Sequence, residues 1–431
     1  MSNRIILHID FNSYFATVEQ QANPRLRGKP IGVTGGDRMT RTVLGAASVE
    51  AKKLGVKTGM QIWEARQLCP DLVLVNGDSD KYLSCTQKFL NILKDYSPFL
   101  EVFSIDECFL EIESSRWGLN LSAENPLLDS RVFDIASQIK DRIRSSIGEW
   151  ITCSIGISYN KVIAKLAGSL NKPDGLVIIS DEESAMHVLD SIPLNEICGI
   201  GSRIKKRLLN MGVTNFASLR MAPKASLLAQ FKSYGLFLYD IARGVNHSAI
   251  MPFYDKPEVK SIGHRHTLSH DTENEIEIKQ LFLKLTELIS RKLRSKNLLG
   301  RTITIWFRDS IDYTSAPGDY HPHFTGDSMQ ITVSPTSDGL EIFNGAWKIF
   351  KRLWHKERIR MIGVSISNLI SSAPQNLSLL DDVIRQEKIL QALDMINDRY
   401  GEFTLQRGIL INTEKVSRKP NPFLADRRFK I

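Results

Sequence analysis

Cysteine is scarce in this chain and follows no pattern. The 431 residues contain five cysteines, and no two of them form a C-x-x-C pair. This argues against a zinc site and against a disulfide framework, and it fits a reducing compartment. No uninterrupted apolar run approaches the roughly 18 residues of a membrane-spanning helix, and the first residues enter a strand-like segment without the features of a signal peptide. We therefore expect a cytoplasmic protein without a membrane partner.

The overall composition is that of a multidomain protein with a basic surplus. Apolar residues make up 42% of the chain, and its length suggests about two to four domains. The formal net charge is +8, and the isoelectric point is about 9.1. A basic chain suits a polyanionic partner, although many basic proteins bind no nucleic acid.

The segment E-V-F-S-I-D-E-C-F-L-E-I at 101–112 is strand-like and largely apolar, but two adjacent acids interrupt it, Asp106 and Glu107. Neighbouring side chains of a strand point to opposite faces, so both acids reach one site only where the chain turns or bulges. We expect a turn between two short strands. Acids in a half-buried place need a compensating charge, and Mg²⁺ held by carboxylates would supply it.

A second apolar strand, R-I-I-L-H-I-D at 4–10, also ends in an acid, Asp10. Three carboxylates at the ends of two strands are the ligands that a two-metal phosphoryl-transfer site uses. Spacing alone leaves an alternative open, in which Asp10 is an ordinary strand end and Asp106–Glu107 a polar hairpin tip.

Several motifs resemble those of the Y-family (translesion) DNA polymerases, in particular the bacterial polymerase IV and V kind. They follow in the family's order over nearly the whole chain: H-I-D-F-N-S-Y-F-A at 8–16, R-L-R-G-K-P at 25–30, E-A-K-K-L-G-V-K-T-G at 50–59, S-I-D-E at 104–107, S-I-G-I-S-Y-N-K at 154–161, N-K-P-D-G at 171–175 and G-I-G at 199–201.

The resemblance implies an α+β multidomain fold of the right-hand polymerase type. Residues 1–12 and 76–165 would form the palm, 13–75 small fingers, 166–245 a helical thumb with a helix-hairpin-helix motif, and 246–258 a linker. Residues 259–370 would form the little finger, and 371–431 a C-terminal tail. The periodicity of 259–370 independently predicts β-α-β-β-α-β, the split βαβ arrangement.

The resemblance also assigns roles at the acids. Two Mg²⁺ ions would be held by Asp10, Asp106, Glu107 and the backbone carbonyl of Phe11. Phe15, in a helix over 12–22 that Asn12 can cap, would be the steric gate that excludes a 2′-OH. The alternative is that Phe15 is simply a buried core residue, as most phenylalanines are.

Two lysines are expected to bind the triphosphate. The lysine of N-K-P, Lys172, corresponds to one that the family places on the β- and γ-phosphates, where it offsets transition-state charge. Many relatives have Tyr and Arg where this chain has Val49 and Lys52. Lys52 keeps a point charge but lacks the bidentate fork of arginine, so we expect weaker or rearranged triphosphate contacts.

The remaining predictions concern binding partners. Gly199 and Gly201 with Lys205 and Lys206 predict a hairpin that grips the phosphate backbone of primer–template DNA. The peptide Q-N-L-S-L-L at 375–380 resembles a sliding-clamp-binding motif without its final aromatic. Accessory subunits are a further expected class of partner.

The sequence therefore predicts template-directed nucleotidyl transfer from a deoxynucleoside triphosphate to a primer 3′-OH, with low fidelity and bypass of damaged templates implied by the resemblance. Two alternatives stay open. One is a palm-domain nucleotide cyclase that needs no template, and the other is a catalytically weak or accessory-dependent DNA-binding relative.

Overall fold

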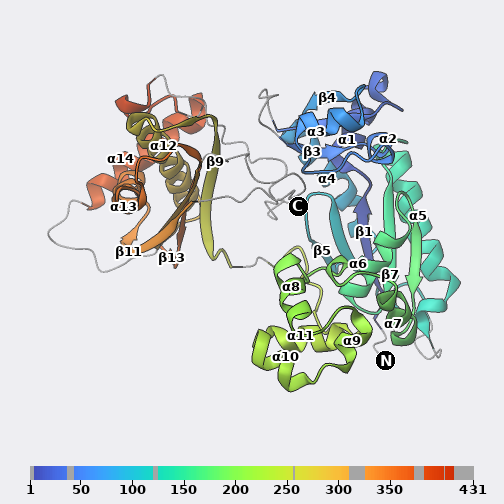
Figure 1. Cartoon of the computed structure of the whole chain (residues 1–431). Coiled ribbons are helices and arrows are strands. Elements are labelled where there is room, and N and C mark those ends of the chain that lie inside the picture. Colours follow the sequence, from blue (N-terminus) through green and yellow to red (C-terminus); the bar gives the residue numbers. More distant parts are fainter. Residues whose placement is uncertain are drawn as a thin grey trace. The chain divides into compact units, whose positions relative to one another are not determined.

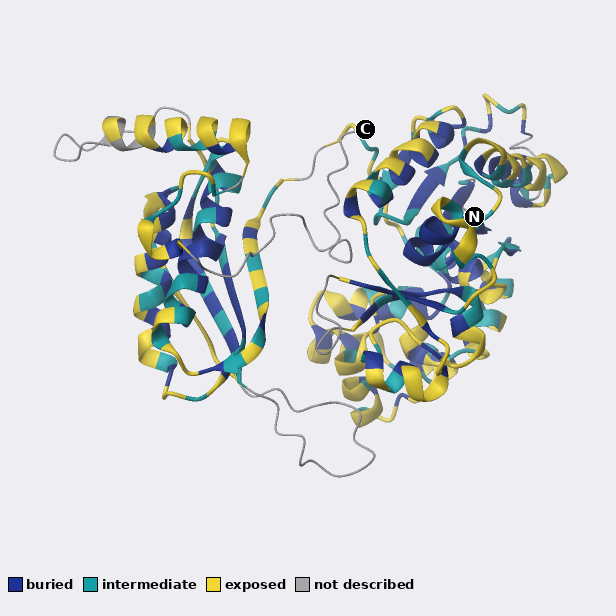
Figure 2. Ribbon diagram, turned by 90° about the horizontal axis from the view of Figure 1, so that it is seen from above, coloured by how far each residue is buried: buried dark blue, intermediate teal, exposed yellow. Residues whose placement is uncertain are grey.

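The computed structural model describes residues 4–35, 43–119, 125–255, 258–309, 326–372, 383–401 and 403–411. These residues divide into two compact units, with the boundary between residues 256 and 257. Figure 1 shows the elements of both, and Figure 2 shows that buried residues run along the strands of each sheet while the outer faces of the helices are exposed. Among the described residues, no helix combines the length and the apolar character needed to cross a membrane.

A five-stranded sheet forms the centre of unit 1. Its order is β5-β6-β1-β7-β8, where the bounds are β1 (Ile6–Phe11), β5 (Leu100–Val102), β6 (Glu107–Glu111), β7 (Cys153–Ser158) and β8 (Leu176–Ile179). The central strand β1 is antiparallel to both β6 and β7, and β8 is parallel to β7. The expected turn between two short strands is confirmed, since β5 and β6 pair and residues 103–106 connect them.

Helices cover both faces of this sheet. On one face, α4 (Ser79–Lys94) and α5 (Ser130–Ile147) pack on Leu7 and Ile9 of β1. On the other face, α6 (Lys161–Leu170) packs on Ile6 through Ala164. Period-2 alternation therefore places His8 and Asp10 on the α6 face.

Glycine lets α6 approach the sheet closely. A Cβ at Gly156 of β7 would lie 2.1 Å from both the Ala164 carbonyl oxygen and the Gly168 backbone nitrogen. Because these are backbone atoms of a packed helix, they cannot move aside. We expect Gly156→Ala to destabilise unit 1 by about 3 kcal/mol or more, as measured by urea unfolding. Gly201→Ala, where a Cβ meets nothing within 4 Å, is the matched control, and equal stabilities of the two variants would contradict the close packing.

A smaller sheet follows β1 in sequence. Its order is β3-β2-β4, with β2 (Ile31–Thr34), β3 (Leu44–Ala47) and β4 (Val73–Asn76), and it carries α1 (Tyr14–Ala22), η1 (Pro24–Leu26), α2 (Val49–Lys53) and α3 (Ile62–Leu68). The predicted cap of α1 is wrong. The helix begins after Ser13, which has φ 48 and makes no side-chain cap. Asn12 instead binds β7 and the residue before it, donating to Thr152 Oγ1 and accepting from Ser154 Oγ.

The predicted boundary between palm and thumb at 165/166 needs correction. It falls inside α6, and β8 then pairs with β7. The short run L-V-I-I at 176–179 thus extends the sheet domain to Ile179. Helices follow from there: α7 (Glu182–Asp190), η3 (Leu194–Glu196), α8 (Ser202–Asn210), α9 (Phe216–Met221), α10 (Lys224–Phe231) and α11 (Tyr234–Ile241).

Unit 2 has the predicted β-α-β-β-α-β order. Its elements are β9 (Ser261–Thr272), α12 (Glu275–Arg294), β10 (Leu298–Asp309), β11 (Ser328–Thr336), α13 (Gly339–Leu353) and β12 (Ile359–Ser367). The antiparallel sheet runs β11-β10-β12-β9, and the short β13 (Ile370–Ser371) pairs with β10. Ile303, Ile305 and Val364 face the two helices in a common core.

Part of the region predicted as a tail is packed onto unit 2. The helix α14 (Val383–Tyr400) is joined to α12 by Arg294, whose guanidinium lies 2.6 Å from Asp394. After it, Leu410 in η4 (Gly408–Leu410) is 2% exposed and belongs to the core of unit 2. Residues 383–411, which the sequence assigned to the C-terminal tail, therefore belong to unit 2.

Candidate active site

The acids of the two strands meet at one end of the unit 1 sheet. Asp10, near the end of β1, pairs in register with Glu107, the first residue of β6. The preceding turn is fixed to β1 because the Phe11 backbone N–H donates to the Asp106 carbonyl oxygen at 3.0 Å. The sheet register therefore brings Asp10 together with two acids that lie almost a hundred residues later in the sequence.

The tightest cluster at this end is not the predicted trio. One ligand atom each of His8, Asp10 and Glu107 lies within 4.8 Å of the others. Asp106 stands outside that cluster, and its Oδ1 accepts a hydrogen bond of 2.6 Å from Ser104 Oγ. His8 was missed at the sequence level. The available signal was the alternation of β1, which puts residues 8 and 10 on one face.

Cations surround the acids. Lys172 Nζ lies 2.5 Å from Asp10 Oδ1, and Lys165 of α6 binds Glu107 Oε2. Lys165 was also missed, although Lys161 and Lys165 lie four residues apart and so on one face of α6. Lys161 binds another nearby acid, Glu101 of β5, at 2.6 Å.

The pKa values of the two adjacent acids diverge. Burial raises the pKa of Asp106 to about 6, assisted by the charges of Asp10 and Glu107 and opposed by the hydrogen bond from Ser104. Burial also acts to raise the pKa of Glu107, but the hydrogen bond from His8 and the charge and hydrogen bond of Lys165 outweigh it and lower that pKa to about 2. Asp106 is thus an acid whose charge the surrounding residues do not fully compensate.

These residues fit a divalent cation. The donors are carboxylate oxygens, which hard cations such as Mg²⁺ prefer, and the raised pKa of Asp106 marks a place where added positive charge is favourable. Asp10, Asp106 and Glu107 would hold the ion.

Lys52 reaches the same site. Partial burial of its ammonium and the nearby charge of Lys172 lower the pKa of Lys52, while Asp10 and Asp106 act in the opposite direction. The structure therefore brings both predicted triphosphate lysines to the acids. The loop that carries Lys172 is fixed by the Gly175 backbone N–H, which donates to Ser154 Oγ of β7.

Phe15 lies in the first turn of α1 and is 7% exposed. Its ring centroid is 4.5 Å from that of Tyr82 on α4. This packing is common to a core aromatic and to a rigid steric gate, so the steric-gate role stays a prediction.

The hairpin residues lie before and within α8. Gly199 has φ +108, and a Cβ there would lie 2.8 Å from the Tyr234 hydroxyl oxygen, so this turn requires glycine. Lys205 Nζ donates to Asn195 Oδ1 at 2.7 Å. Lys206 is exposed, and Gly201 has open space around its Cα. DNA binding by these four residues stays a prediction.

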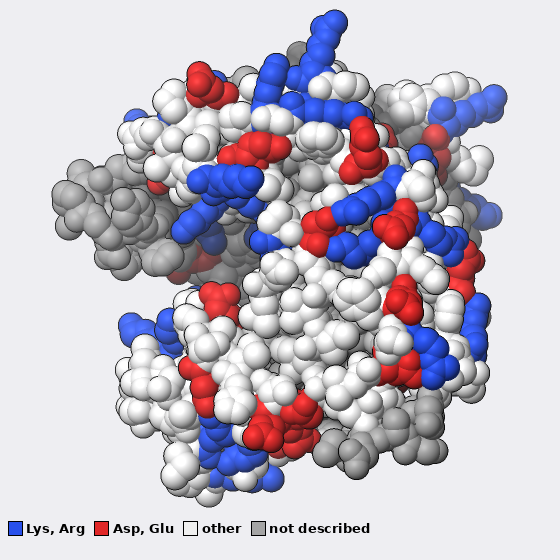
Figure 3. Space-filling view, turned by 90° about the vertical axis from the view of Figure 1, so that its right-hand side faces the viewer, with Lys and Arg blue, Asp and Glu red and all other residues white. Residues whose placement is uncertain are grey.

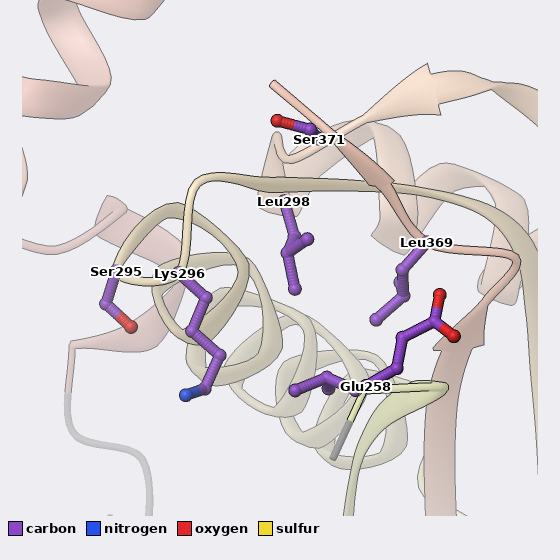
Figure 4. A pocket seen from close by; sticks show the side chains of 7 residues that line it. Glu258, Ser295, Lys296, Leu298, Leu369 and Ser371 are labelled. Atoms are coloured by element: carbon purple, nitrogen blue, oxygen red, sulfur yellow. The ribbon is translucent and has the colours of Figure 1, made fainter. Parts of the chain in front are cut away.

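A hollow of about 470 Å³ lies in unit 2, lined by Glu258, Lys296 and Leu369 among others (Figure 4). It contains a single carboxylate and no histidine or cysteine, so it offers no ligand set like that of the acid cluster. The predicted clamp peptide at 375–380 lies outside the described residues.

Comparisons with known proteins agree with the arrangement of these motifs. The model of the impB/mucB/samB family matches residues 9–169, and that of the same family's C-terminal domain matches residues 259–379. A DNA polymerase IV of Moorella thermoacetica is 33% identical over 406 residues, covering 94% of this chain and 95% of that protein. A DNA polymerase IV of Pelotomaculum thermopropionicum is 32% identical over 416 residues, covering 96% of this chain and 97% of that protein.

A solved structure shows the same fold. The Y-family DNA polymerase chimera Dbh-Dpo4(243-245)-Dbh aligns with a TM-score of 0.68 at 25% identity, covering 85% of this chain and 99% of that chain. The family models together match well over half of the 431 residues. This chain belongs to the impB/mucB/samB family and is a Y-family DNA polymerase.

Proposed function

We propose that this protein is an error-prone, template-directed DNA polymerase that extends a primer 3′-OH with deoxynucleotides and continues past damaged template bases. The convergence of Asp10, Asp106 and Glu107 at one end of β1 and β6 carries the proposal. Two Mg²⁺ ions would be bound there, with the Phe11 carbonyl as a further ligand. Bound Mg²⁺ would activate the attacking hydroxyl and neutralise charge on the phosphates.

The chain's own residues bind and orient the triphosphate. Lys172 lies beside Asp10, and Lys52 is near enough to Asp10 and Asp106 for their charges to act on its pKa, so both offer ammonium groups to a polyanion. Positioned cations stabilise the charge that builds up on the transferred and leaving phosphates. Without substrate, Lys172 compensates the charge of Asp10 directly.

Two surfaces are proposed to bind primer–template DNA. One is the hairpin of Gly199 and Gly201 with Lys205 and Lys206. The other is the face of the unit 2 sheet opposite its core, which carries Arg265, Thr304 and Ser365 by strand alternation. Among the described residues on the face shown in Figure 3, by contrast, acidic and basic side chains are interspersed.

Further partners remain proposals. The peptide at 375–380 is proposed to bind the sliding clamp, and accessory subunits are proposed to assist lesion bypass in the cytoplasm. Q-N-L-S-L-L supplies leucines for a pocket on the clamp.

Primer extension tests the proposed function. Purified protein with Mg²⁺ is expected to extend a primer on an intact template and past an abasic site, with products that depend on the template. Pyrophosphate release without any template would favour the cyclase alternative. DNA binding without extension would favour the catalytically weak relative.

Phe15→Ala should increase ribonucleotide incorporation relative to deoxynucleotide incorporation by at least about tenfold, because the ring no longer excludes the 2′-OH. A difference of about 1.4 kcal/mol corresponds to tenfold. The ratio of kcat/KM for the two nucleotide types is the measurement. Phe133→Ala, at a position 50% exposed on α5, serves as the control. Unchanged sugar discrimination in Phe15→Ala would show that Phe15 is only a core residue.

Lys52→Arg should lower the KM for deoxynucleotides severalfold, because the guanidinium fork binds phosphate through two parallel hydrogen bonds. Steady-state single-nucleotide insertion measures this KM. The same substitution at the neighbouring exposed residue of α2, Lys53→Arg, should leave it unchanged. Equal KM values in wild type and both variants would show that Lys52 does not bind the triphosphate.

A further inference from the structure

His8 is enclosed in the middle of β1. It is 1% exposed, and its ring centroid lies 4.8 Å from that of Phe109 on β6. On the other side, a Cβ at Gly168 of α6 would lie 3.2 Å from His8 Nδ1. The ring is therefore held by two elements and has little freedom to rotate.

The surroundings determine which ring nitrogen carries the proton. His8 Nε2 lies 3.0 Å from Glu107 Oε2, whereas Nδ1 has no hydrogen-bond partner within the described part of the chain. A proton on Nδ1 would be a buried donor without a partner, which is unfavourable. The ring therefore donates from Nε2 to Glu107.

Both donors to Glu107 bind the same oxygen. His8 Nε2 and Lys165 Nζ each contact Oε2, and Oε1 has no partner among the described residues. Lys165 reaches Oε2 through a flexible four-carbon side chain that is 26% exposed, whereas the His8 side chain is 2% exposed. Lys165 therefore compensates the charge of Glu107, whereas the rigid ring of His8 fixes the orientation of its carboxylate.

We propose that His8 is a positioning residue, whose hydrogen bond to Oε2 holds the Glu107 carboxylate so that Oε1 is kept for a divalent cation. This role rests on the proposed function of the acid site, and it assigns His8 itself no contact with the ion. Without the ring, a carboxylate held by Lys165 alone must lose rotational freedom when the cation binds. Loss of such an outer hydrogen bond typically costs 10–100-fold in metal affinity.

Direct metal binding tests this role without any need for turnover. Chelator-treated full-length protein is titrated with Mn²⁺, and free Mn²⁺ is measured by electron paramagnetic resonance without DNA or nucleotide. Asp10→Asn identifies the binding that belongs to this site. His8→Phe keeps a ring but loses the donor, and His8→Gln places an amide N–H near the position of Nε2. Thermal unfolding of the chelated proteins shows whether each variant is folded, and His8→Met replaces His8→Phe if the latter is not.

We expect His8→Phe to bind Mn²⁺ about tenfold more weakly than wild type and His8→Gln to remain within about threefold. Equal affinity in His8→Phe and wild type would overturn the positioning role, as would a loss in His8→Gln as large as that in His8→Phe. A wild type without Asp10-dependent Mn²⁺ binding would overturn it too. Failure of the proposed function is seen separately, as absence of primer extension by the wild type.

Discussion

Asp106→Asn is expected to lower the rate of primer extension by at least about 10³-fold, which corresponds to about 4 kcal/mol of transition-state stabilisation. The substitution keeps the size of the side chain and its ability to accept the hydrogen bond from Ser104. It removes the negative charge from a half-buried position beside Asp10 and Glu107. A neutral amide is a poor ligand for a hard divalent cation compared with a carboxylate, so the chemistry should fail while the fold remains.

Single-turnover extension of a labelled primer measures this effect, with DNA affinity determined in parallel by fluorescence anisotropy. Asp95→Asn is the matched control, because Asp95 pairs with Arg142 through a carboxylate that is 62% exposed. We expect that variant to extend primers at the wild-type rate. Undiminished extension by Asp106→Asn would show that the metal site lies elsewhere or that the activity belongs to a contaminating polymerase.

The parts of the fold that the sequence predicted are those with a long periodic signal. In unit 2, alternating strands and two amphipathic helices predicted the β-α-β-β-α-β order that the structure has. In unit 1 the apolar spacing of residues 161–170 indicates a helix, and α6 spans Lys161–Leu170. The strand β8 was missed because four apolar residues are too few to distinguish a strand from a helix segment. Its assignment depends on pairing with β7, which is a tertiary contact.

The site residues, too, were predicted where the sequence carries a local signal and missed where only tertiary packing brings them in. Asp10 and Glu107 were predicted because acids interrupting apolar strands stand out in a sequence. That Glu107 receives two donors while Asp106 receives one from Ser104 depends on the register of β1 and β6 and on the close approach of α6. His8 and Lys165 carry no unusual sequence signal, since a histidine in a strand and a lysine on a helix are usually structural. Packing at Gly156 and Gly168, rather than spacing, makes them part of the site.

The same Asp106→Asn substitution should stabilise the metal-free protein at neutral pH. The pKa of Asp106 is raised from 3.8 to about 6 by burial and by the neighbouring acids. Below its unfolded-state pKa, such an acid is protonated in both states and does not destabilise the fold. As pH rises through the folded-state pKa, the folded protein loses stability, because the carboxylate must then be charged in its half-buried place. A shift of about two units corresponds to about 3 kcal/mol, so above pH 6 the wild type should be less stable than Asp106→Asn by that amount. Catalysis and stability then oppose each other at one residue.

Thermal unfolding with a chelator present measures this difference across pH. For a domain of about 150–250 residues, a stability difference of about 3 kcal/mol corresponds to a difference of roughly 6–12 °C in Tm. The Tm of Asp106→Asn should therefore exceed that of the wild type by about this amount at pH 8. The gap should shrink as pH falls through 6 and vanish below about pH 4. Added Mg²⁺ should raise the Tm of the wild type and leave that of the variant unchanged, because only the wild type presents the full carboxylate set. A pH-independent difference, or a variant less stable than wild type at pH 8, would mean that the Asp106 carboxylate is already compensated in the folded protein.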